Sequence, residues 1–336
     1  MSQSKETPLH EEHSGDNPLD LIVGTSPAMC EVKALVTQVS ERNTTVLIQG
    51  ESGTGKELVA WALHRLSPRG SGPFLTLNCA AVPADLIESE LFGHKRGAFT
   101  GAVSDHKGLF RAADTGTLFL DEIEATQPAM QVKLLRSLQT GEVRPVGEIL
   151  TQQVDVRLVA ASNRDLYQYV NQGLFREDLF YRINVFPIHL APLRERKEDI
   201  PVLTAHILGK LFQQTGKSLK GLDAAAMELL QRYSWPGNVR ELENELERAH
   251  VLVEEGGTVS VRCLSPRLTD SVEQLLKESA TPEPQTLKEA VEELERRMVI
   301  DALTKSDGNR SKAAEYLGLS RQGLLNKIHK YGLDTT

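Results

Sequence analysis

Residues 50–57, GESGTGKE, have the residue types and the spacing of a phosphate-binding loop. In this segment four residues separate Gly50 from the pair Gly55–Lys56. Glycines at such positions let backbone N–H groups turn inward around phosphates, and the lysine ammonium reaches the terminal phosphates. The predicted nucleotide site comprises Gly50, Glu51, Ser52, Gly53, Thr54, Gly55, Lys56 and Glu57.

A second group able to do chemistry is the acidic pair Asp121–Glu122, which ends the run TLFLDE. Glu57 stands where a Ser or Thr usually meets Mg²⁺, so the ion must depend on other groups. Asp121 can hold Mg²⁺, directly or through water, and Glu122 can polarise the attacking water. An acidic pair at a strand end can be merely solvated. Beside a phosphate-binding loop it favours ATP hydrolysis, with ATP and Mg²⁺ as cofactors.

Residues 97–102, GAFTGA, offer no metal ligands, and they fit neither a core strand nor an ordinary turn. Gly97 and Gly101 allow a hinged tip, on which Phe99 and Thr100 present an apolar ring and a hydroxyl to a partner. The alternative is a buried turn with Phe99 in the core. The candidate contact loop comprises Gly97, Ala98, Phe99, Thr100, Gly101 and Ala102.

A parallel sheet would bring the first two groups together. Short apolar runs, read as buried strands, alternate with amphipathic stretches: TVLIQG (45–50), FLTLN (74–78), TLFLDE (117–122) and VRLVAAS (156–162). This alternation predicts an α/β fold with helices on both faces of the sheet. The carboxyl ends of parallel strands meet at one edge, where α/β proteins bind ligands.

The pattern changes along the chain and predicts five segments. A polar tail (1–18) precedes the α/β region (19–190), and a smaller all-α region follows (191–265). Residues 266–286 carry two close prolines and few large apolar residues, so we interpret them as a linker. The last segment (287–336) is again helical.

Composition excludes several classes of protein. The 336 residues are 40% hydrophobic and carry a net charge of −8, so any nucleic-acid contact must rely on locally concentrated positive charge. The three cysteines form neither a metal spacing nor a disulfide framework. No apolar run approaches eighteen residues and no signal peptide begins the chain, so we expect a cytoplasmic protein.

The last fifty residues have the pattern of a helix-turn-helix. A one-face apolar spacing over 287–304 is followed by NRSKAAEYLG and LSRQGLLNKIHKYGL, with Ser320 as the expected N-cap of the last helix. Ala313, Ala314 and Leu317 are expected to pack against Leu324, Leu325 and Ile328. Gly323 costs about 1 kcal/mol inside a helix, and a close approach to DNA or to a helix would explain it.

Charge supports DNA binding by this segment, although a helical hairpin for protein contacts is the alternative. Arg321, Gln322 and Asn326 have the chemistry to reach base edges, whereas Lys327 and Lys330 suit phosphates. The candidate DNA-binding residues are Arg310, Ser320, Arg321, Gln322, Asn326, Lys327 and Lys330. Helix 287–304 is a candidate dimer element.

Longer runs of the sequence resemble one family. The AAA+ domain of sigma-54-dependent transcriptional activators, the bacterial enhancer-binding proteins, is similar to GESGTGKE, NCAAV, ELFGHKRGAFTGA, GTLFLDE, FREDLFYRINVFPIHLAPLRER and WPGNVREL. The resemblance covers roughly residues 19–255, and GAFTGA with its LFGH lead-in is specific because general AAA+ ATPases lack it. It implies an AAA+ P-loop sheet, a small all-α lid and a Fis-like helix-turn-helix.

The resemblance also implies roles for individual residues. Lys56 resembles the Walker A lysine, Glu57 is the residue that the family shows there, and Asp121 and Glu122 resemble the Walker B pair. Asn78 resembles the residue that hydrogen-bonds the catalytic Glu and switches it with nucleotide state.

Two sensor residues follow in the same way. Asn163 resembles sensor I, beside Ser162 where the family often has Thr, and Arg240 in GNVREL resembles sensor II.

Arg176 and Arg182 resemble arginine fingers, and which of them is the main finger stays open. A guanidinium supplied by a neighbouring subunit would make hydrolysis depend on assembly, and a head-to-tail interface repeated by rotation closes into a ring. The alternative is that both arginines are surface ion-pair partners of Glu177 and Asp178.

The implied function is ATP-dependent activation of transcription. The C-terminal segment would bind double-stranded DNA upstream of promoters, while dimers assemble into a hexameric ring that remodels closed complexes of RNA polymerase with sigma-54 into open ones. No sensory domain fits into residues 1–18, so we expect control in trans, through a partner or the expression level, or else a missing natural N-terminal domain. The competing hypotheses are an AAA+ remodelling enzyme outside transcription and a DNA-binding regulator with an inactive ATPase fold.

Overall fold

The computed structural model describes residues 17–270, 287–306 and 309–331. The predicted tail (1–18) and linker (266–286) therefore lie largely outside the described residues, and residues 266–270 are helical. The chain divides into two compact units, Met1–Thr269 and Asp270–Thr336, and each is described by itself.

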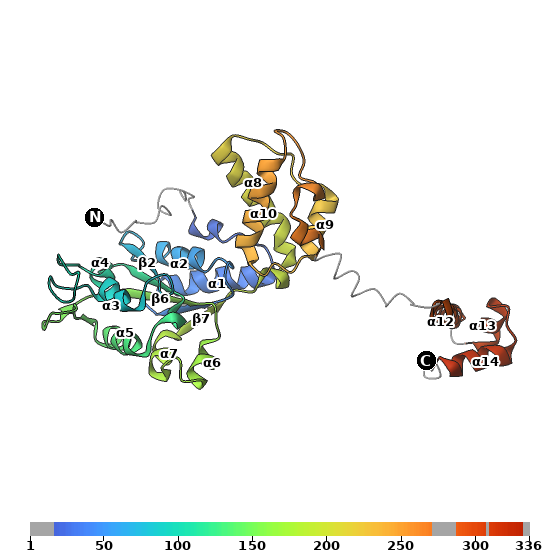
Figure 1. Ribbon diagram of the computed structural model, residues 1–336, viewed down its shortest axis with the longest axis horizontal. Helices are drawn as coiled ribbons and strands as arrows, with labels where there is room; N and C mark the ends of the chain where they lie inside the picture. The colour runs from blue at the N-terminus through green and yellow to red at the C-terminus, as the bar shows by residue number, and fades with distance from the viewer. Residues whose placement is uncertain (1–16, 271–286, 307–308, 332–336) are drawn as a thin grey trace. The chain divides into compact units, whose positions relative to one another are not determined.

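The first unit contains a five-stranded parallel sheet in the order β2-β3-β6-β1-β7 (Figure 1). Its strands are β1 (Val46–Gln49), β2 (Phe74–Asn78), β3 (Thr117–Asp121), β6 (Arg157–Ser162) and β7 (Phe186–His189). The α/β fold class and four of these strands confirm the prediction. The fifth strand, β7, was not predicted because Pro187 interrupts its apolar run; a proline is tolerated there since β7 is an edge strand.

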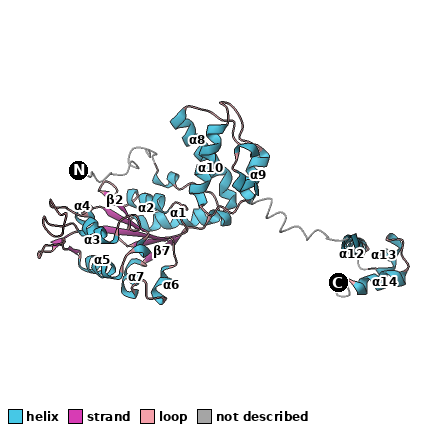
Figure 2. Ribbon diagram, viewed as in Figure 1, coloured by secondary structure: helices cyan, strands magenta, loops and turns pink. Residues whose placement is uncertain are grey.

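Helices cover both faces of this sheet, as the alternation in the strands requires (Figures 1 and 2). On one face, Val46 and Ile48 of β1 pack in a core with α1 (Pro27–Ser40) and α2 (Lys56–Arg65). On the other face, Leu47 packs with α3 (Ala84–Phe92), α5 (Pro128–Thr140) and α7 (Glu177–Ile183). The sheet is therefore buried on both sides, and its functional groups lie at strand ends.

Shorter elements complete the α/β part. The remaining helices are α4 (Leu109–Ala112) and α6 (Leu166–Asn171), and β4 (Glu142–Val143) pairs antiparallel with β5 (Gln152–Gln153). The 3-10 turns of the α/β part are η2 (Pro18–Leu21) and η3 (Ile123–Ala125); η4 (Leu193–Glu195) and η5 (Lys197–Asp199) lead into the helical part that follows, and η6 (Val261–Cys263) comes after that part's last long helix.

Three helices form the small α-helical part that we call the lid: α8 (Ile200–Thr215), α9 (Ala224–Arg232) and α10 (Asn238–Leu252). Trp235 is fully buried, stacks edge-on against Tyr233 at 5.0 Å between ring centroids, and donates to the Leu230 carbonyl at 2.8 Å. This indole fixes the chain between α9 and α10.

The second unit is a three-helix bundle of α12 (Leu287–Lys305), α13 (Arg310–Tyr316) and α14 (Arg321–Lys330). Ser320 caps α14 as predicted, since its hydroxyl accepts from the Gly323 N–H at 3.1 Å. A Cβ at Gly323 would lie 3.2 Å from that hydroxyl, which gives a local reason for glycine there. The buried core contains Val299, Ala302, Ala313, Ala314, Leu324 and Ile328; Leu325, predicted with them, is half-buried and outside this cluster.

Among the residues that the structure describes, no helix is long and apolar enough to cross a membrane.

Candidate nucleotide site, partner loop and DNA-binding unit

The P-loop connects β1 to α2 and takes its shape from left-handed glycines. Gly53 and Gly55 have φ of +77° and +103°, and Gly55 is the N-cap of α2. The Lys56 side chain is buried, and its ammonium donates to the carbonyls of Gly50 (2.9 Å) and Glu51 (3.1 Å). The loop thus holds the lysine at its centre, where it can exchange these carbonyls for phosphate oxygens.

Acidic side chains surround this ammonium. Burial lowers the pKa of Lys56, while the charges of Asp121, Glu124 and Glu122 oppose that effect. Glu57 lies in the same environment, and burial together with the Asp121 charge raises its pKa. The arrangement balances one buried cation against several carboxylates.

The acidic strand end forms as the sequence indicated. β3 ends at Asp121, Glu122 follows with φ of +52°, and the Glu122 N–H donates to Asp121 Oδ1 at 2.9 Å. Carboxylates are the ligands that Mg²⁺ prefers, and it takes few of them from protein when phosphates are present. Across the described residues no group of three His, Cys, Asp or Glu is arranged to hold a metal, so an ion at Asp121 would complete its shell with phosphate and water.

Asn78 reaches the same edge, because β2 pairs with β3 so that Asn78 lies opposite Asp121. Its carboxamide oxygen accepts from the N–H groups of Ala80 (2.9 Å) and Ala81 (3.1 Å). That oxygen is engaged in a local turn, and a bond between Asn78 and Glu122 stays a prediction.

Glu124 is a site residue that our sequence reasoning missed. Its Oε1 accepts from the Asn163 N–H at 3.2 Å, and its buried Oε2 has no hydrogen-bond partner in the structure. Burial raises the pKa of this carboxyl. Glu124 therefore links the acidic turn after β3 to the end of β6, where sensor I was expected. The signal was present as the third carboxylate of DEIE (121–124).

The lid contacts the P-loop through the start of α10. The Gly53 carbonyl accepts from the N–H groups of Val239 (2.9 Å) and Arg240 (3.4 Å), and the Arg240 guanidinium lies 3.4 Å from Ser52 Oγ. The structure thus brings Arg240 to the loop, as expected of a sensor II residue. Two further contacts, from Arg194 and Asn238 to Glu51, were missed because no local pattern marks them.

Arg176 is the N-cap of α7 and Arg182 lies in its last turn, and neither contributes to the hydrogen bonds of the P-loop described above. Arg176 makes a bidentate ion pair with Asp178, at 2.7 Å and 3.0 Å, and Arg182 donates to the Leu138 carbonyl at 2.6 Å. The hydrogen bonds to Asp178 raise the pKa of Arg176, and Arg176 in turn lowers that of Asp178. Within the chain, the ion-pair alternative describes Arg176, and the finger role requires a neighbouring subunit.

The GAFTGA loop is compact. Gly97 and Gly101 have φ of +83° and +106°, and the loop is closed by the Gly97 N–H, which donates to the Ala102 carbonyl at 2.9 Å. Phe99 is 38% exposed and lies edge-on against the His94 ring, with 5.0 Å between centroids. Phe99 is part of neither core of the α/β part, which contradicts the buried-turn alternative.

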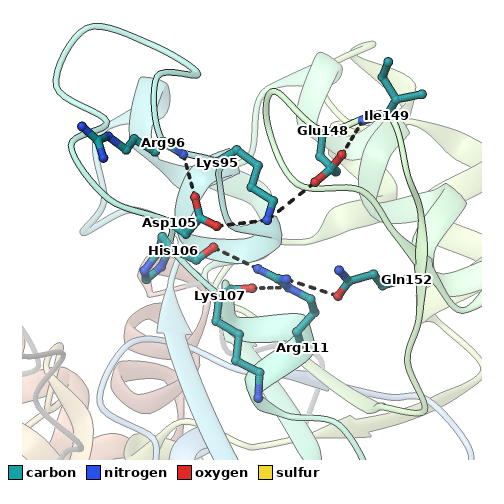
Figure 3. Close-up of polar contacts among 9 residues, drawn as sticks. All are labelled: Lys95, Arg96, Asp105, His106, Lys107, Arg111, Glu148, Ile149 and Gln152. Atoms are coloured by element: carbon teal, nitrogen blue, oxygen red, sulfur yellow. Dashed lines mark hydrogen bonds and ion pairs between the residues drawn. The ribbon is translucent and has the colours of Figure 1, made fainter.

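Ion pairs fix the base of this loop (Figure 3). Asp105 accepts from the Arg96 N–H at 2.8 Å and from the Lys95 ammonium at 3.0 Å, and that ammonium lies 3.7 Å from Glu148 in the neighbouring segment 144–151. Arg111 donates to the His106 carbonyl at 2.9 Å and to Gln152 at 3.2 Å. The base is therefore bonded to the neighbouring segments, and the tip presents Phe99 and Thr100.

The helix-turn-helix separates the predicted DNA contacts into two groups. Arg310, Arg321, Gln322 and Asn326 are exposed. Lys327 and Lys330 instead form ion pairs with α12, to Glu295 at 2.6 Å and Glu292 at 2.9 Å. The Ser320 hydroxyl is engaged as the N-cap of α14, where it accepts from the Gly323 N–H. Contact of Arg321, Gln322 and Asn326 with base edges stays a prediction, and the two lysines connect α14 to α12.

A parallel sheet with a P-loop, an acidic strand end and an all-α lid defines the class of AAA+ ATPases. The family models agree: residues 22–189 match the sigma-54 interaction domain, residues 194–281 the AAA+ ATPase lid domain, and residues 290–331 the Fis family of bacterial regulatory proteins. The chain belongs to the sigma-54-dependent transcriptional activators, and it carries their ATPase domain and a Fis-type helix-turn-helix for DNA binding.

Similar proteins include two bacterial regulators and a solved structure. The regulatory protein AtoC of Escherichia coli K12 is 44% identical over 327 residues, which cover 97% of this chain and 71% of AtoC. The nitrogen fixation protein AnfA of Azotobacter vinelandii is 46% identical over 312 residues, or 93% of this chain and 57% of AnfA. Among solved structures, NtrX of Brucella abortus in complex with ATP has a TM-score of 0.68 and 34% identity, covering 92% of this chain and 69% of NtrX.

Proposed function

We propose that this chain hydrolyses MgATP in a ring and uses the energy to convert closed complexes of RNA polymerase with sigma-54 into open complexes. The observation that carries the proposal is the combination, in one unit, of Lys56 inside a P-loop, the Asp121–Glu122 strand end and an exposed GAFTGA tip. The first two supply hydrolysis, and the third supplies a contact for the sigma factor.

In this mechanism each residue has a separate task. Lys56 leaves its carbonyl partners for the terminal phosphates, and Asp121 holds Mg²⁺ directly or through water. Glu122 orients the attacking water, and Asn163 and Arg240 sense the terminal phosphate from the sheet edge and the lid. NtrX, which is 34% identical, has been crystallised with ATP and with ADP, and this supports nucleotide binding at the matching loop.

We further propose that Arg176 or Arg182 completes the site of a neighbouring subunit. A guanidinium that stabilises transition-state charge is worth on the order of 10³ to 10⁵ in rate. Both side chains lie on the surface around α7, where a neighbour can reach them. Dimers that assemble into a hexamer would provide this contact.

The DNA-binding unit would bind double-stranded DNA upstream of promoters as a dimer, in the cytoplasm where the polymerase acts. On α12 the side chains of Val291, Leu294 and Met298, spaced three and four residues apart, are exposed. An apolar stripe with this spacing fits a second copy of the helix. A trans-acting regulator of the ATPase remains part of the proposal.

The experiment that tests the function is open-complex formation by purified components. Wild-type chain, RNA polymerase, sigma-54 and ATP should form heparin-resistant complexes on a sigma-54-type promoter. Lys56→Ala should form none, because it loses the phosphate contact, and Glu122→Gln should bind ATP without turning it over. Full activity of Lys56→Ala would exclude the site. ATPase activity without any open complex would favour a remodelling role outside transcription.

A further inference from the structure

The Glu51 side chain, the first after Gly50 in the P-loop, is bonded to the lid and to the segment that leads into it. Its two carboxylate oxygens accept from Arg194, at 2.7 Å and 2.8 Å. One of them also accepts from the Asn238 amide at 3.2 Å. Arg194 lies in η4, just before the lid, and Asn238 is the first residue of α10.

The burial, backbone conformation and hydrogen bonds of Asn238 all hold its side chain in this contact. It is fully buried with φ of +53°, a conformation that non-glycine residues adopt rarely. Its oxygen accepts from the Leu193 N–H at 2.8 Å, and its amide also donates to the Ser52 carbonyl at 3.0 Å. The amide of Asn238 therefore binds the P-loop, while its oxygen binds η4.

The next P-loop residues continue the connection. The Gly53 carbonyl accepts from the N–H groups of the second and third residues of α10, and a Cβ at Gly53 would lie 2.3 Å from the Gly237 carbonyl. Three successive residues, 51–53, are thus bonded to the lid side on their outer surface. Their inner surface is where phosphates are expected to bind.

The bidentate ion pair between Arg194 and Glu51 orients η4 relative to the P-loop, and it adds little to the stability of the fold. Glu51 and Arg194 are each about 40% exposed, and ion pairs this exposed contribute little to the free energy of unfolding. A planar fork on a carboxylate is directional, however, so it fixes how η4 meets the loop. The hydrogen bonds from Arg194 hold the pKa of Glu51 below its usual value, and the carboxylate stays ionised.

We propose that Glu51, Arg194 and Asn238 form a lid latch, which transmits the nucleotide state of the P-loop to the lid. In this role Glu51 is a positioning residue, and its carboxylate does not bind the nucleotide. Phosphates that draw the inner N–H groups of residues 51–56 toward themselves shift the outer bonds to the lid at the same time. The inference rests on the proposed nucleotide site.

The test replaces the charge while keeping the shape, with Glu51→Gln in the full chain. We expect kcat for ATP hydrolysis to fall about tenfold while KM and the Kd for ADP stay within about threefold, since an interaction used only during turnover affects kcat. In the wild type, ADP should change amide hydrogen exchange in residues 236–242, and Glu51→Gln should lose that change. Glu195→Gln is the matched control, because Glu195 lies 3.9 Å from the same guanidinium and is exposed.

A double-mutant cycle separates a latch from general damage. Arg194→Gln should have little further effect in the Glu51→Gln background, less than about twofold, because both changes remove one interaction. Arg194→Lys, which keeps the charge without the fork, should fall between the wild type and Arg194→Gln, and it tests the latch if Glu51→Gln does not fold. Additive losses in the cycle would contradict the latch.

Two results would overturn the assignment of Glu51. An increase of about tenfold in the Kd for ADP with unchanged kcat would make Glu51 a nucleotide ligand. Wild-type turnover and exchange in Glu51→Gln would show that the latch has no role. Binding of ADP and turnover by the wild-type chain are measured first, so a failure of the proposed nucleotide site is recognised separately.

Discussion

Single residues show how the site balances its charges. Lys56 is buried, and its ammonium faces three carboxylates, of which Asp121 has the largest effect on its pKa. Glu124 differs from the other two, because one of its oxygens is buried and has no hydrogen-bond partner among the described residues, while the other accepts from the Asn163 N–H. A buried, ionised carboxylate with a hydrogen bond to only one of its oxygens lowers the free energy of unfolding.

We predict that Glu124→Gln raises stability at high pH. Burial raises the pKa of Glu124, so the native chain keeps its proton at pH values where the unfolded chain has released it. Stability then falls as pH rises from the ordinary carboxyl pKa through the raised one. Without nucleotide, the thermal midpoint of Glu124→Gln should exceed that of the wild type by about 2 °C or more at pH 8, and by less at pH 5.

The control is Glu31→Gln, which removes an exposed carboxylate on α1. Its thermal midpoint should match that of the wild type at both pH values. A lower midpoint for Glu124→Gln at pH 8 would mean that the charged hydrogen bond to Asn163 outweighs the burial.

At the scale of helices and loops, the contacts between elements determine which side chains can reach a partner. The GAFTGA tip stands on a base that Asp105 and Arg111 bind to neighbouring backbone and to Gln152 (Figure 3). In the DNA-binding unit, two lysines of α14 form ion pairs with glutamates of α12, whereas Arg321 and Gln322 are exposed. In both places the contacts between neighbouring elements determine which side chains stay exposed to a partner.

Thr100→Ala should uncouple hydrolysis from the sigma factor. Thr100 is exposed at the tip and outside the nucleotide site, so ATPase activity should stay within about twofold of the wild type. Capture of sigma-54 by rings trapped with ADP and aluminium fluoride should be lost. Ser104→Ala, an exposed hydroxyl four residues further on, is the control. Normal capture and normal open-complex formation by Thr100→Ala would exclude the loop as the contact.

Arg321→Ala and Lys330→Ala should differ in DNA binding. Arg321 is exposed at the start of α14, and loss of a base contact costs about 1–3 kcal/mol, or roughly tenfold or more in Kd. Lys330 is paired with Glu292, so its loss should change Kd less than about threefold. Fluorescence anisotropy on a fragment recovered by immunoprecipitation measures both. A salt slope reduced by about one in Lys330→Ala would mean that DNA takes this lysine from Glu292.

For the whole molecule, hydrolysis should depend on assembly. Within one chain Arg176 is bound to Asp178, so it can serve a nucleotide site only by leaving that carboxylate for a neighbour. The same reasoning predicts that the exposed residues around α7 lie at a subunit contact.

Mixing two inactive variants tests this dependence. Lys56→Ala keeps its finger and Arg176→Ala keeps its P-loop, so a 1:1 mixture should recover about a quarter of wild-type ATPase activity, the fraction of interfaces that combine both intact parts. Arg182→Ala in place of Arg176→Ala shows which arginine is the finger. A mixture no more active than its components would place the arginine in the site of its own chain.

The sequence determined those features of this protein that depend on neighbouring residues. Short, mostly apolar runs indicated four strands of four to six residues, because a buried parallel strand needs no polar alternation. The spacing in GESGTGKE and the Asp121–Glu122 pair located the candidate site, and Ser320 marked the start of α14. Each of these signals arises from local backbone geometry.

The tertiary structure decided what joins distant parts of the chain. Glu51 and Arg194 are 143 residues apart, Glu51 and Asn238 are 187 apart, and Lys327 meets Glu295 across 32 residues. A charged residue that is solvated and one that binds another subdomain look alike in sequence, because the difference is only where the partner lies after folding. For the same reason β7, with its proline, became a strand only when the edge of the sheet was available to it.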